Sequence, residues 1–281
     1  MNGILILNKE NGITSAEELN KVKRILGIKG IGHTGTLDPM ATGVLVVLLG
    51  KCTKLSDVIT SLTKEYIATV KIGIKTDTLD ITGNILEEKK EVLEKDKLLS
   101  VINSFKKTYE QEVPGYSSVR INGKHLYEYT REGIKVKLPK REVTIHEIEL
   151  LEIKEDEFTF RCLVSKGTYI RSLIRDICDE LGVIGTMSAL NRTKQGIFGI
   201  KDSYTIEDIE NGNYELIPLE KVLVHEKRII TEENKKQIMN GSILERNSDK
   251  EYFFYYENDI LKVIYKIYDK NDKLIKPLLF L

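Results

Sequence analysis

The chain has 281 residues, and its 43 Lys and Arg residues balance its 43 Asp and Glu residues, so the formal net charge is zero. Hydrophobic residues make up 41% of the sequence and charged residues 31%, a composition typical of a globular protein with one large and one small domain. No apolar run reaches the roughly eighteen residues of a membrane span, and no basic-then-apolar leader is present. We therefore expect a cytoplasmic protein.

The spacing of the cysteines and histidines argues against two further classes, disulfide-stabilised proteins and metal-binding proteins. The cysteines, Cys52, Cys162 and Cys178, are odd in number and form no CxxC pair, which predicts reduced thiols. The histidines have no metal-ligand spacing with one another or with cysteine, so we expect no metal site.

Charge is distributed in blocks along the chain. Lys and Arg outnumber Asp and Glu in residues 1–75, 113–145 and 166–201, whereas acids prevail in the segments between and after them. The positive blocks also carry the motifs described below, which favours a focused basic face. Taken alone, such alternation is equally typical of ordinary solvated surface.

The N-terminal third predicts a compact unit of strands and a helix. Residues 3–8, GILILN, indicate a buried strand. Thr14 and Glu17 have capping-box spacing at the start of an apolar helical stripe that Gly27 should end. The continuous apolar run VLVVLLG at 44–50 predicts a second buried strand.

Two periodic segments follow. KEYIATVKIGI at 64–74 alternates as a strand, with one apolar face made of Tyr66, Ala68, Val70, Ile72 and Ile74. A Lys- and Glu-rich stretch at 84–112 contains an amphipathic helix with inward residues Leu98, Leu99, Val101, Ile102 and Phe105. Both segments predict scaffold, because a tyrosine that leads an apolar face is most often part of the core, with its hydroxyl hydrogen-bonded.

An antiparallel pair at 141–153 and 157–165 is expected before a helix in SKGTYIRSLIRDICDELG, residues 165–182. Thr168 is placed to cap this helix and Gly182 to end it. Arg171 lies in its first turn, where a positive charge opposes the helix macrodipole. An ion pair with a carboxylate is the obvious compensation.

Beyond about residue 220 the sequence turns to short aromatic strands, YFFYY at 252–256 and LKVIYKIY at 261–268. About sixty residues make a marginal core on their own. We therefore expect residues 221–281 to form a small β module docked on a main domain of residues 1–220.

The loop GHTGTLDPMATGVL at 32–45 is the most informative stretch. Asp38 is the only acid between Glu18 and Asp57. A single Asp-Pro is commonly a turn or a helix cap. The whole string, however, resembles the signature loop GHTGxLDPxATGxL of the bacterial tRNA pseudouridine synthase B (TruB) family, in which the aspartate is the nucleophile.

The resemblance continues through four more ordered motifs over roughly residues 3–205. They are the tyrosine-bearing strand with TDTLDITG at 76–83, the basic segment YSSVRINGKHLYEYTREG at 116–133, KGTYIR at 166–171 and ALNRTKQGIFGI at 189–200. Val113, Arg120 and Asn191 depart from the usual pattern, and Glu10 replaces a usual proline after Lys9.

The resemblance implies roles for individual residues. Three residues would be catalytic: Asp38 as the nucleophile, Arg171 as its ion-pair partner, and Tyr66, whose ring would stack on the target base. Segment 113–140 would be an RNA-contacting insertion, the thumb, and 221–281 a reduced PUA-type RNA-binding module. RNA contacts are expected from Lys9, His33, Arg120, Lys124, Lys166, Tyr169, Leu190 and Arg192. On residues alone, His33 is as well explained by a bond to the backbone.

The function implied is isomerisation of the T-loop uridine, position 55 of tRNA, to pseudouridine. The implied fold is α+β, with a mixed, largely antiparallel sheet and flanking helices. Because the isomerisation balances in atoms and oxidation state, no cofactor is expected. The partner would be the tRNA T-arm stem-loop, with no obligate protein partner, so we expect a monomer. Two alternatives stay open: a guide-RNA-dependent pseudouridine synthase and a non-catalytic tRNA-folding chaperone.

Overall fold

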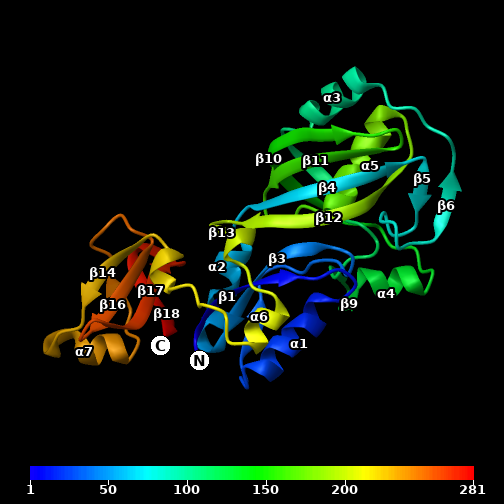
Figure 1. Ribbon diagram of the computed structural model, residues 1–281. Coiled ribbons are helices and arrows are strands. Elements are labelled where there is room, and N and C mark those ends of the chain that lie inside the picture. Colours follow the sequence, from blue (N-terminus) through cyan, green and yellow to red (C-terminus); the bar gives the residue numbers. More distant parts are fainter.

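The computed structural model describes all 281 residues, which fold around two separate β-sheets (Figure 1). The nine strands of the larger sheet are β1 (Gly3–Lys9), β2 (Ile31–His33), β3 (Thr42–Leu49), β4 (Lys64–Ile72), β7 (Thr108–Glu112), β10 (Lys140–Ile153), β11 (Glu157–Val164), β12 (Gly185–Gln195) and β13 (Phe198–Gly199). Their spatial order is β1-β3-β12-β4-β11-β10-β7, with β2 beside β3 and β13 beside β12. Only the β12–β3 pairing is parallel. The expected α+β fold with a mixed, largely antiparallel sheet is confirmed.

Six α-helices belong to the main body. They are α1 (Ser15–Ile25), α2 (Ser56–Thr60), α3 (Lys95–Ser104), α4 (Leu126–Arg131), α5 (Ile170–Leu181) and α6 (Ile206–Glu210). Short 3-10 helices lie at η1 (Gly50–Leu55), η2 (Ile200–Asp202) and η3 (Leu219–Lys221). Two hairpins complete the main body, β5 (Ile74–Thr76) with β6 (Ile85–Glu88) and β8 (Arg120–Ile121) with β9 (Lys124–His125).

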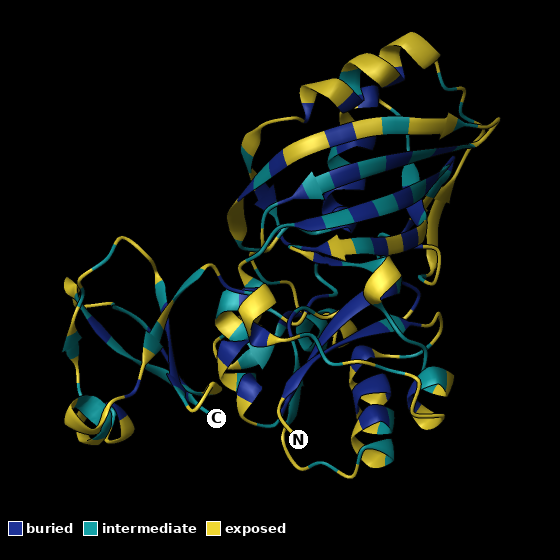
Figure 2. Ribbon diagram, turned by 60° about the vertical axis from the view of Figure 1, so that its left-hand side comes forward, coloured by how far each residue is buried: buried dark blue, intermediate teal, exposed yellow.

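Burial explains why the strands differ in sequence pattern. Strands β1 and β3 are buried on both faces, because α1 and α6 pack on one side and η1 and α2 on the other. Such strands need continuous apolar runs, as both have. Strand β4 buries every second residue against α3 and α5, so its sequence alternates. Figure 2 shows this alternation as bands of buried and half-buried residues along the central strands β4 and β11.

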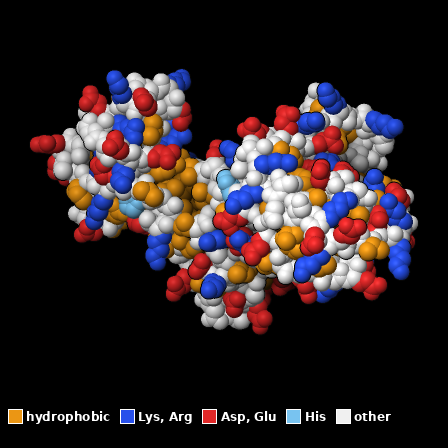
Figure 3. All heavy atoms as spheres, turned by 90° about the horizontal axis from the view of Figure 1, so that it is seen from above, with side chains coloured by type: hydrophobic (Ala, Val, Ile, Leu, Met, Phe, Trp, Pro, Cys, Tyr) orange, Lys and Arg blue, Asp and Glu red, His pale blue; other side chains and the backbone are white.

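The smaller sheet contains β14 (His225–Ile229), β15 (Leu244–Glu245), β16 (Tyr252–Glu257), β17 (Ile260–Tyr268) and β18 (Asn271–Phe280), with helix α7 (Glu232–Met239) alongside. One face packs on Ile238 of α7, and the other places Phe254, Ile264 and Leu279 in a cluster with Ile4 and Val46 of the large sheet. In Figure 3 hydrophobic side chains gather where this smaller lobe meets the rest of the molecule. The lobe thus completes its small core against the main body.

Three local expectations were wrong. Strand β4 ends at Ile72 because Gly73 adopts φ +86°, so Ile74 lies in β5 instead. Leu99 is exposed on the outer face of α3. Thr168 does not cap α5; its hydroxyl donates to the Ser165 carbonyl, and Tyr169 is the N-cap residue.

Candidate active site

The Asp38 loop joins β2 to β3, and two buried cations, Lys9 and Arg192, hold it through hydrogen bonds to its backbone carbonyls. Lys9, 1% exposed, donates from Nζ to the carbonyls of Glu10, Pro39 and Ala41 at 2.7, 3.0 and 2.7 Å. Arg192, also 1% exposed, donates from Nε to the Val44 carbonyl at 2.7 Å and from a terminal nitrogen to the Gly35 carbonyl at 3.0 Å. Both ends of the loop are therefore fixed before any ligand arrives.

Gly43 shows how tightly this loop is packed. Its φ is +100°, a conformation that side chains disfavour, and a Cβ there would lie 2.3 Å from the Arg192 carbonyl oxygen. Only glycine fits where β3 begins its parallel pairing with β12. The close approach keeps the Asp38 loop against the floor of the cleft.

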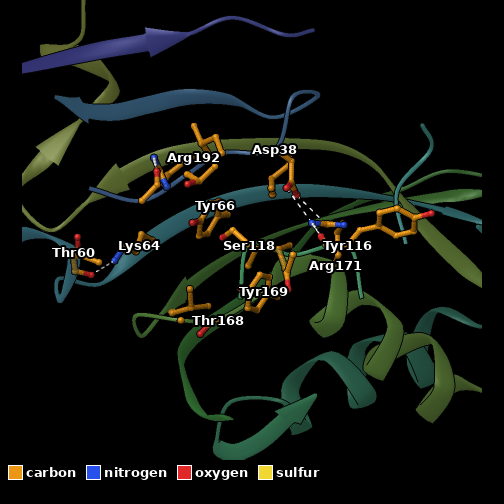
Figure 4. A pocket seen from close by; sticks show the side chains of 18 of the residues that line it. Asp38, Thr60, Lys64, Tyr66, Tyr116, Ser118, Thr168, Tyr169, Arg171 and Arg192 are labelled. Atoms are coloured by element: carbon orange, nitrogen blue, oxygen red, sulfur yellow. Dashed lines mark hydrogen bonds and ion pairs between the residues drawn. The ribbon is translucent and has the colours of Figure 1, made fainter. Parts of the chain in front are cut away.

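Asp38 and Arg171 form a two-point ion pair (Figure 4). Arg171 Nε lies 2.9 Å from Asp38 Oδ2, and a terminal nitrogen donates to Oδ1 at 3.0 Å. Arg171 is 6% exposed, and 33% of the Asp38 side chain remains open to the cleft. The carboxylate partner expected for a cation in the first turn of α5 is confirmed, and Asp38 keeps an accessible edge.

The remaining donors of Arg171 reach two other segments. One terminal nitrogen donates to the Thr78 carbonyl at 2.9 Å and lies 3.7 Å from Asp80 Oδ2, while the other donates to the Tyr116 carbonyl at 3.0 Å. Every side of the guanidinium plane is thus engaged. Arg171 joins the Asp38 loop, the TDTLDITG turn and the segment 113–140.

The two acids of the TDTLDITG turn, Asp77 and Asp80, differ in role. Asp77 accepts from the backbone of Asn84 at 2.9 Å and stays a turn residue. Asp80 is 5% exposed and accepts from Thr78 Oγ1 at 2.9 Å and from the backbone nitrogen of Thr82 at 3.0 Å. Asp80 therefore adds a second buried carboxylate beside Arg171, which the sequence pattern did not reveal.

Electrostatics at Asp38 are a balance of opposed effects. Burial raises the pKa of its carboxyl above the ordinary value, the Arg171 guanidinium opposes that shift, and the charge of Asp80 adds to it. Desolvation dominates, so the ion pair limits the rise without cancelling it. The arrangement yields a carboxylate that is less stabilised by solvent than a surface aspartate and hence a better nucleophile when ionised.

A cavity of about 370 Å³ opens over this pair. That volume falls within the ~300–1,000 Å³ of typical small-ligand sites. It is lined by the predicted residues Asp38, Tyr66, Tyr169, Arg171, Leu190 and Arg192, together with Thr60, Lys64, Ser117, Ser118, Tyr127 and Thr168. Figure 4 shows Tyr66 between the Asp38–Arg171 pair and Lys64, with Ser118 beside Tyr66 and Tyr169 below them in the view. The cavity thus combines the Asp38 carboxylate with the aromatic rings of Tyr66 and Tyr169.

The other predicted RNA contacts are dispersed. His33 does not line the cavity; its buried Nδ1 has no partner, and burial followed by the charge of Arg192 lowers its pKa. Lys166 is exposed at the cavity rim segment 165–167. In the thumb, Arg120 Nε donates to His125 Nε2 at 3.2 Å, and Lys124 pairs with Glu132.

Lys9 and Arg192 require a different role from the one expected. With 1% exposure and their donors directed at loop carbonyls, these two side chains hold the Asp38 loop instead of reaching outward to phosphates. The sequence could not distinguish a cation that holds the Asp38 loop from one that contacts RNA, because either role places a Lys or Arg near the GHTGTLDPMATGVL motif.

Lys64 is the clearest cavity residue that sequence reasoning overlooked. It is 7% exposed, donates to the Leu62 carbonyl at 2.7 Å, and has its pKa lowered to about 8 by burial and by the charges of Arg192 and Lys166. The signal was present, since Lys64 begins the same alternating face as Tyr66.

Comparison with known proteins assigns the class. The sequence model described as TruB family pseudouridylate synthase (N terminal domain) matches residues 23–170, and that of the tRNA pseudouridylate synthase B C-terminal domain matches 171–224. The first match alone spans more than half of the chain and defines a pseudouridylate synthase. Within that class, the chain belongs to the TruB family.

Curated relatives agree. The tRNA pseudouridine synthase B of Caldicellulosiruptor saccharolyticus is 40% identical over 251 residues, covering 89% of this chain and 86% of the relative. That of Clostridium kluyveri is 38% identical over 278 residues, covering 98% and 94%. The similarity therefore includes nearly the full length of both proteins.

Solved structures show the same fold. A chain in a structure of an H/ACA RNP bound to a substrate RNA containing 2'-deoxyuridine has TM-score 0.68 and 26% identity, covering 94% of this chain and 77% of that one. A chain in a Cbf5-Nop10-Gar1 complex has TM-score 0.68 and 27% identity, covering 94% of this chain and 78% of that one.

No helix of this protein is long and apolar enough to cross a membrane. No group of three or more His, Cys, Asp or Glu side chains is arranged to hold a metal ion.

Proposed function

We propose that this chain is a tRNA pseudouridine synthase that isomerises the T-loop uridine at position 55 of tRNA. The observation that carries the proposal is the two-point Asp38–Arg171 pair at the floor of a cavity, in a chain whose curated relatives are named tRNA pseudouridine synthase B. Residues 1–75, 113–145 and 166–201, which surround that cavity, are also the basic blocks of the sequence.

The reaction needs no net redox change. The C1′–N1 bond of uridine breaks, the uracil turns, C5 bonds to C1′, and the proton on C5 is lost while N1 gains one. Attack by the Asp38 carboxylate at C1′, its attack at C6 of the base, and proton removal from the sugar to give a glycal all require an ionised carboxylate beside the nucleotide. Arg171 serves each route by keeping Asp38 ionised and oriented.

The target base must leave the RNA stack to reach Asp38. Flipping a base costs a few kcal/mol, and stacking on an aromatic ring returns ~1–3 kcal/mol per base. Tyr66 lines the cavity while 8% exposed, so its ring is already held by the core and loses little freedom on stacking. Tyr169 offers a second ring in the lining of the same cavity.

Domain organisation is part of the proposal. We assign residues 1–220 to the catalytic domain, 113–140 to its thumb and 221–281 to a small PUA-like RNA-binding domain. The matched sequence models end at residue 224, and the second sheet begins at His225, which supports this division. The protein is proposed to work in the cytoplasm without an obligate protein partner.

The H/ACA RNP likeness favours a second candidate, a guide-RNA-dependent synthase. A bare T-arm stem-loop separates the candidates. Pseudouridine formed by the purified chain without guide RNA supports the proposal, and product only with added guide RNA and proteins would favour the second candidate. A chaperone without catalysis would yield no pseudouridine and would keep its RNA-folding effect in Asp38→Asn.

A further inference from the structure

Arg171 and Tyr169 lie at the first turn of α5, and the position of this helix end is set from outside the helix. Tyr169 is the N-cap residue, and no side chain within the helix caps it. The backbone N–H of Tyr169 donates instead to Oε1 of Gln111 on β7, at 2.8 Å. Gln111 is 1% exposed, so this bond is made away from competing water.

The orientation of the Gln111 amide is determined by its partners. Because the Tyr169 backbone can only donate, the amide oxygen must face it and the NH₂ group must face Tyr109. Gln111 Nε2 donates to the Tyr109 hydroxyl at 2.9 Å, and that hydroxyl in turn donates to Asp176 Oδ2 at 3.1 Å. Burial and the Asp176 charge raise the pKa of Tyr109, so its hydroxyl remains a donor.

The other end of this chain of bonds is anchored on α5 as well. Asp176 belongs to α5, and its Oδ1 accepts from Arg175 Nε at 3.0 Å and from an Arg175 terminal nitrogen at 2.8 Å. The directed series Tyr169, Gln111, Tyr109, Asp176 therefore begins and ends on the same helix. Strand β7 holds α5 at both its first and second turns.

This series of hydrogen bonds acts on the active site only by setting the position of the start of α5. Tyr169 lines the cavity, and Arg171, two residues further on, pairs with Asp38. Gln111 touches neither the cavity nor Asp38, since it is absent from the cavity lining. The same strand ends where the thumb begins, and Val113 N–H donates to the Pro139 carbonyl at 3.0 Å to close the thumb base.

We infer that Gln111 is a positioning residue for the isomerisation, which sets the start of α5 so that Arg171 and Tyr169 meet Asp38 and the flipped base. The inference rests on the proposed function. Gln111 would contact no substrate, yet its removal would lower the turnover rate. A displacement of about 1 Å at reacting groups can cost on the order of 100-fold in rate.

The test uses two variants of the full chain. Gln111→Met keeps the side-chain volume but removes the acceptor for Tyr169 and the donor to Tyr109. Its kcat on a T-arm stem-loop should fall on the order of 10-fold to 100-fold, with a smaller change in KM. A folded Gln111→Met protein with wild-type kcat would overturn the inference.

Gln111→Glu gives a second test, the pH dependence of kcat, which a change in packing alone would not alter. This test remains available if Gln111→Met does not fold. When protonated, the introduced carboxyl can accept from Tyr169 and donate to Tyr109 as the amide does. When ionised, it cannot donate to the Tyr109 hydroxyl. Its negative charge then lies near that of Asp176, which binds the same hydroxyl. The ratio of variant to wild-type kcat should therefore rise as pH falls, and a ratio independent of pH contradicts the proposal.

Thr108→Val is the matched control. Thr108 lies on the same strand, and its hydroxyl bonds to Thr144 Oγ1 at 2.8 Å without touching α5. It should retain wild-type kcat, and an equal fall would assign the effect to a weakened strand and overturn the role of Gln111. A wild-type chain that forms no pseudouridine instead refutes the proposed function, which distinguishes the two failures.

Discussion

Arg171 contacts both carboxylate oxygens of Asp38, at 2.9 and 3.0 Å, although the two residues are separated by 133 positions in the chain. The same guanidinium also binds the carbonyls of Thr78 and Tyr116. The Asp38 carboxylate is thus oriented by a group that also contacts the thumb and the TDTLDITG turn.

Removing each member of this pair should give different results. Asp38→Asn should fold and form no pseudouridine, because an amide keeps the shape without the nucleophilic charge. Arg171→Ala should also be inactive and should lose stability. Removing one partner of a fully buried pair costs about 3–5 kcal/mol, and because 33% of the Asp38 side chain is exposed we expect about 2 kcal/mol.

The double variant tests the coupling. Asp38→Asn with Arg171→Ala should regain part of the stability lost in Arg171→Ala, without activity, as measured by urea unfolding and by pseudouridine analysis of the RNA. Appreciable turnover by Asp38→Asn would show that Asp38 is not the nucleophile. A double variant no more stable than Arg171→Ala would show that the pair is uncoupled.

Stability should depend on pH through Asp38. Since burial raises its folded-state pKa, the protonated carboxyl is favoured by folding, and this contribution is lost as pH rises through that pKa. Wild type should therefore lose stability relative to Asp38→Asn as pH rises from the ordinary carboxyl pKa of about 4 through the higher folded-state pKa. Denaturant unfolding of both proteins across this range measures the difference. The opposite slope would mean that Arg171 outweighs desolvation.

Tyr66→Phe separates the ring from the hydroxyl. The ring should still stack, so RNA binding should stay near normal, whereas turnover should fall on the order of 100-fold if the hydroxyl moves a proton at C5. Tyr204→Phe is the control, because Tyr204 packs beside the β1–β3 cluster and does not line the cavity. Unchanged turnover in Tyr66→Phe would assign the residue to packing and stacking alone.

The thumb should order on RNA. Its base is closed by the Val113–Pro139 bond, whereas residues 118–136 carry only short elements, so their amides should exchange rapidly in the free protein and slowly with a T-arm bound. Hydrogen exchange measures this directly. Equal protection in both states would refute it.

Neutralising Arg120 and Lys124 together should weaken RNA binding and flatten its dependence on salt. Neutralising Lys90 and Lys95, which are exposed beside and at the start of α3, should leave the salt dependence unchanged. Binding isotherms at several salt concentrations compare the two pairs. Equal salt slopes for wild type and Arg120/Lys124 variants would exclude a phosphate contact by the thumb.

The amino-acid pattern alone specified the features that depend on near neighbours. The capping box of Thr14 and Glu17, the alternation of β4 and the stop at Gly182 all follow from local geometry, and each is present. The place of Asp38 also followed from sequence, because one acid within a long string of glycines and hydroxyl residues marks a single loop between two apolar strands.

Roles that depend on direction and burial needed the tertiary structure. Lys9 and Arg192 are cations near a motif in sequence, and only their burial shows that they bind loop carbonyls. Asp77 and Asp80 look alike as turn acids, yet only Asp80 turns toward Arg171. A linear pattern records which groups are available. Which of them lose water and meet across distant parts of the sequence is decided by how the sheet packs on α5, and that depends on the whole chain.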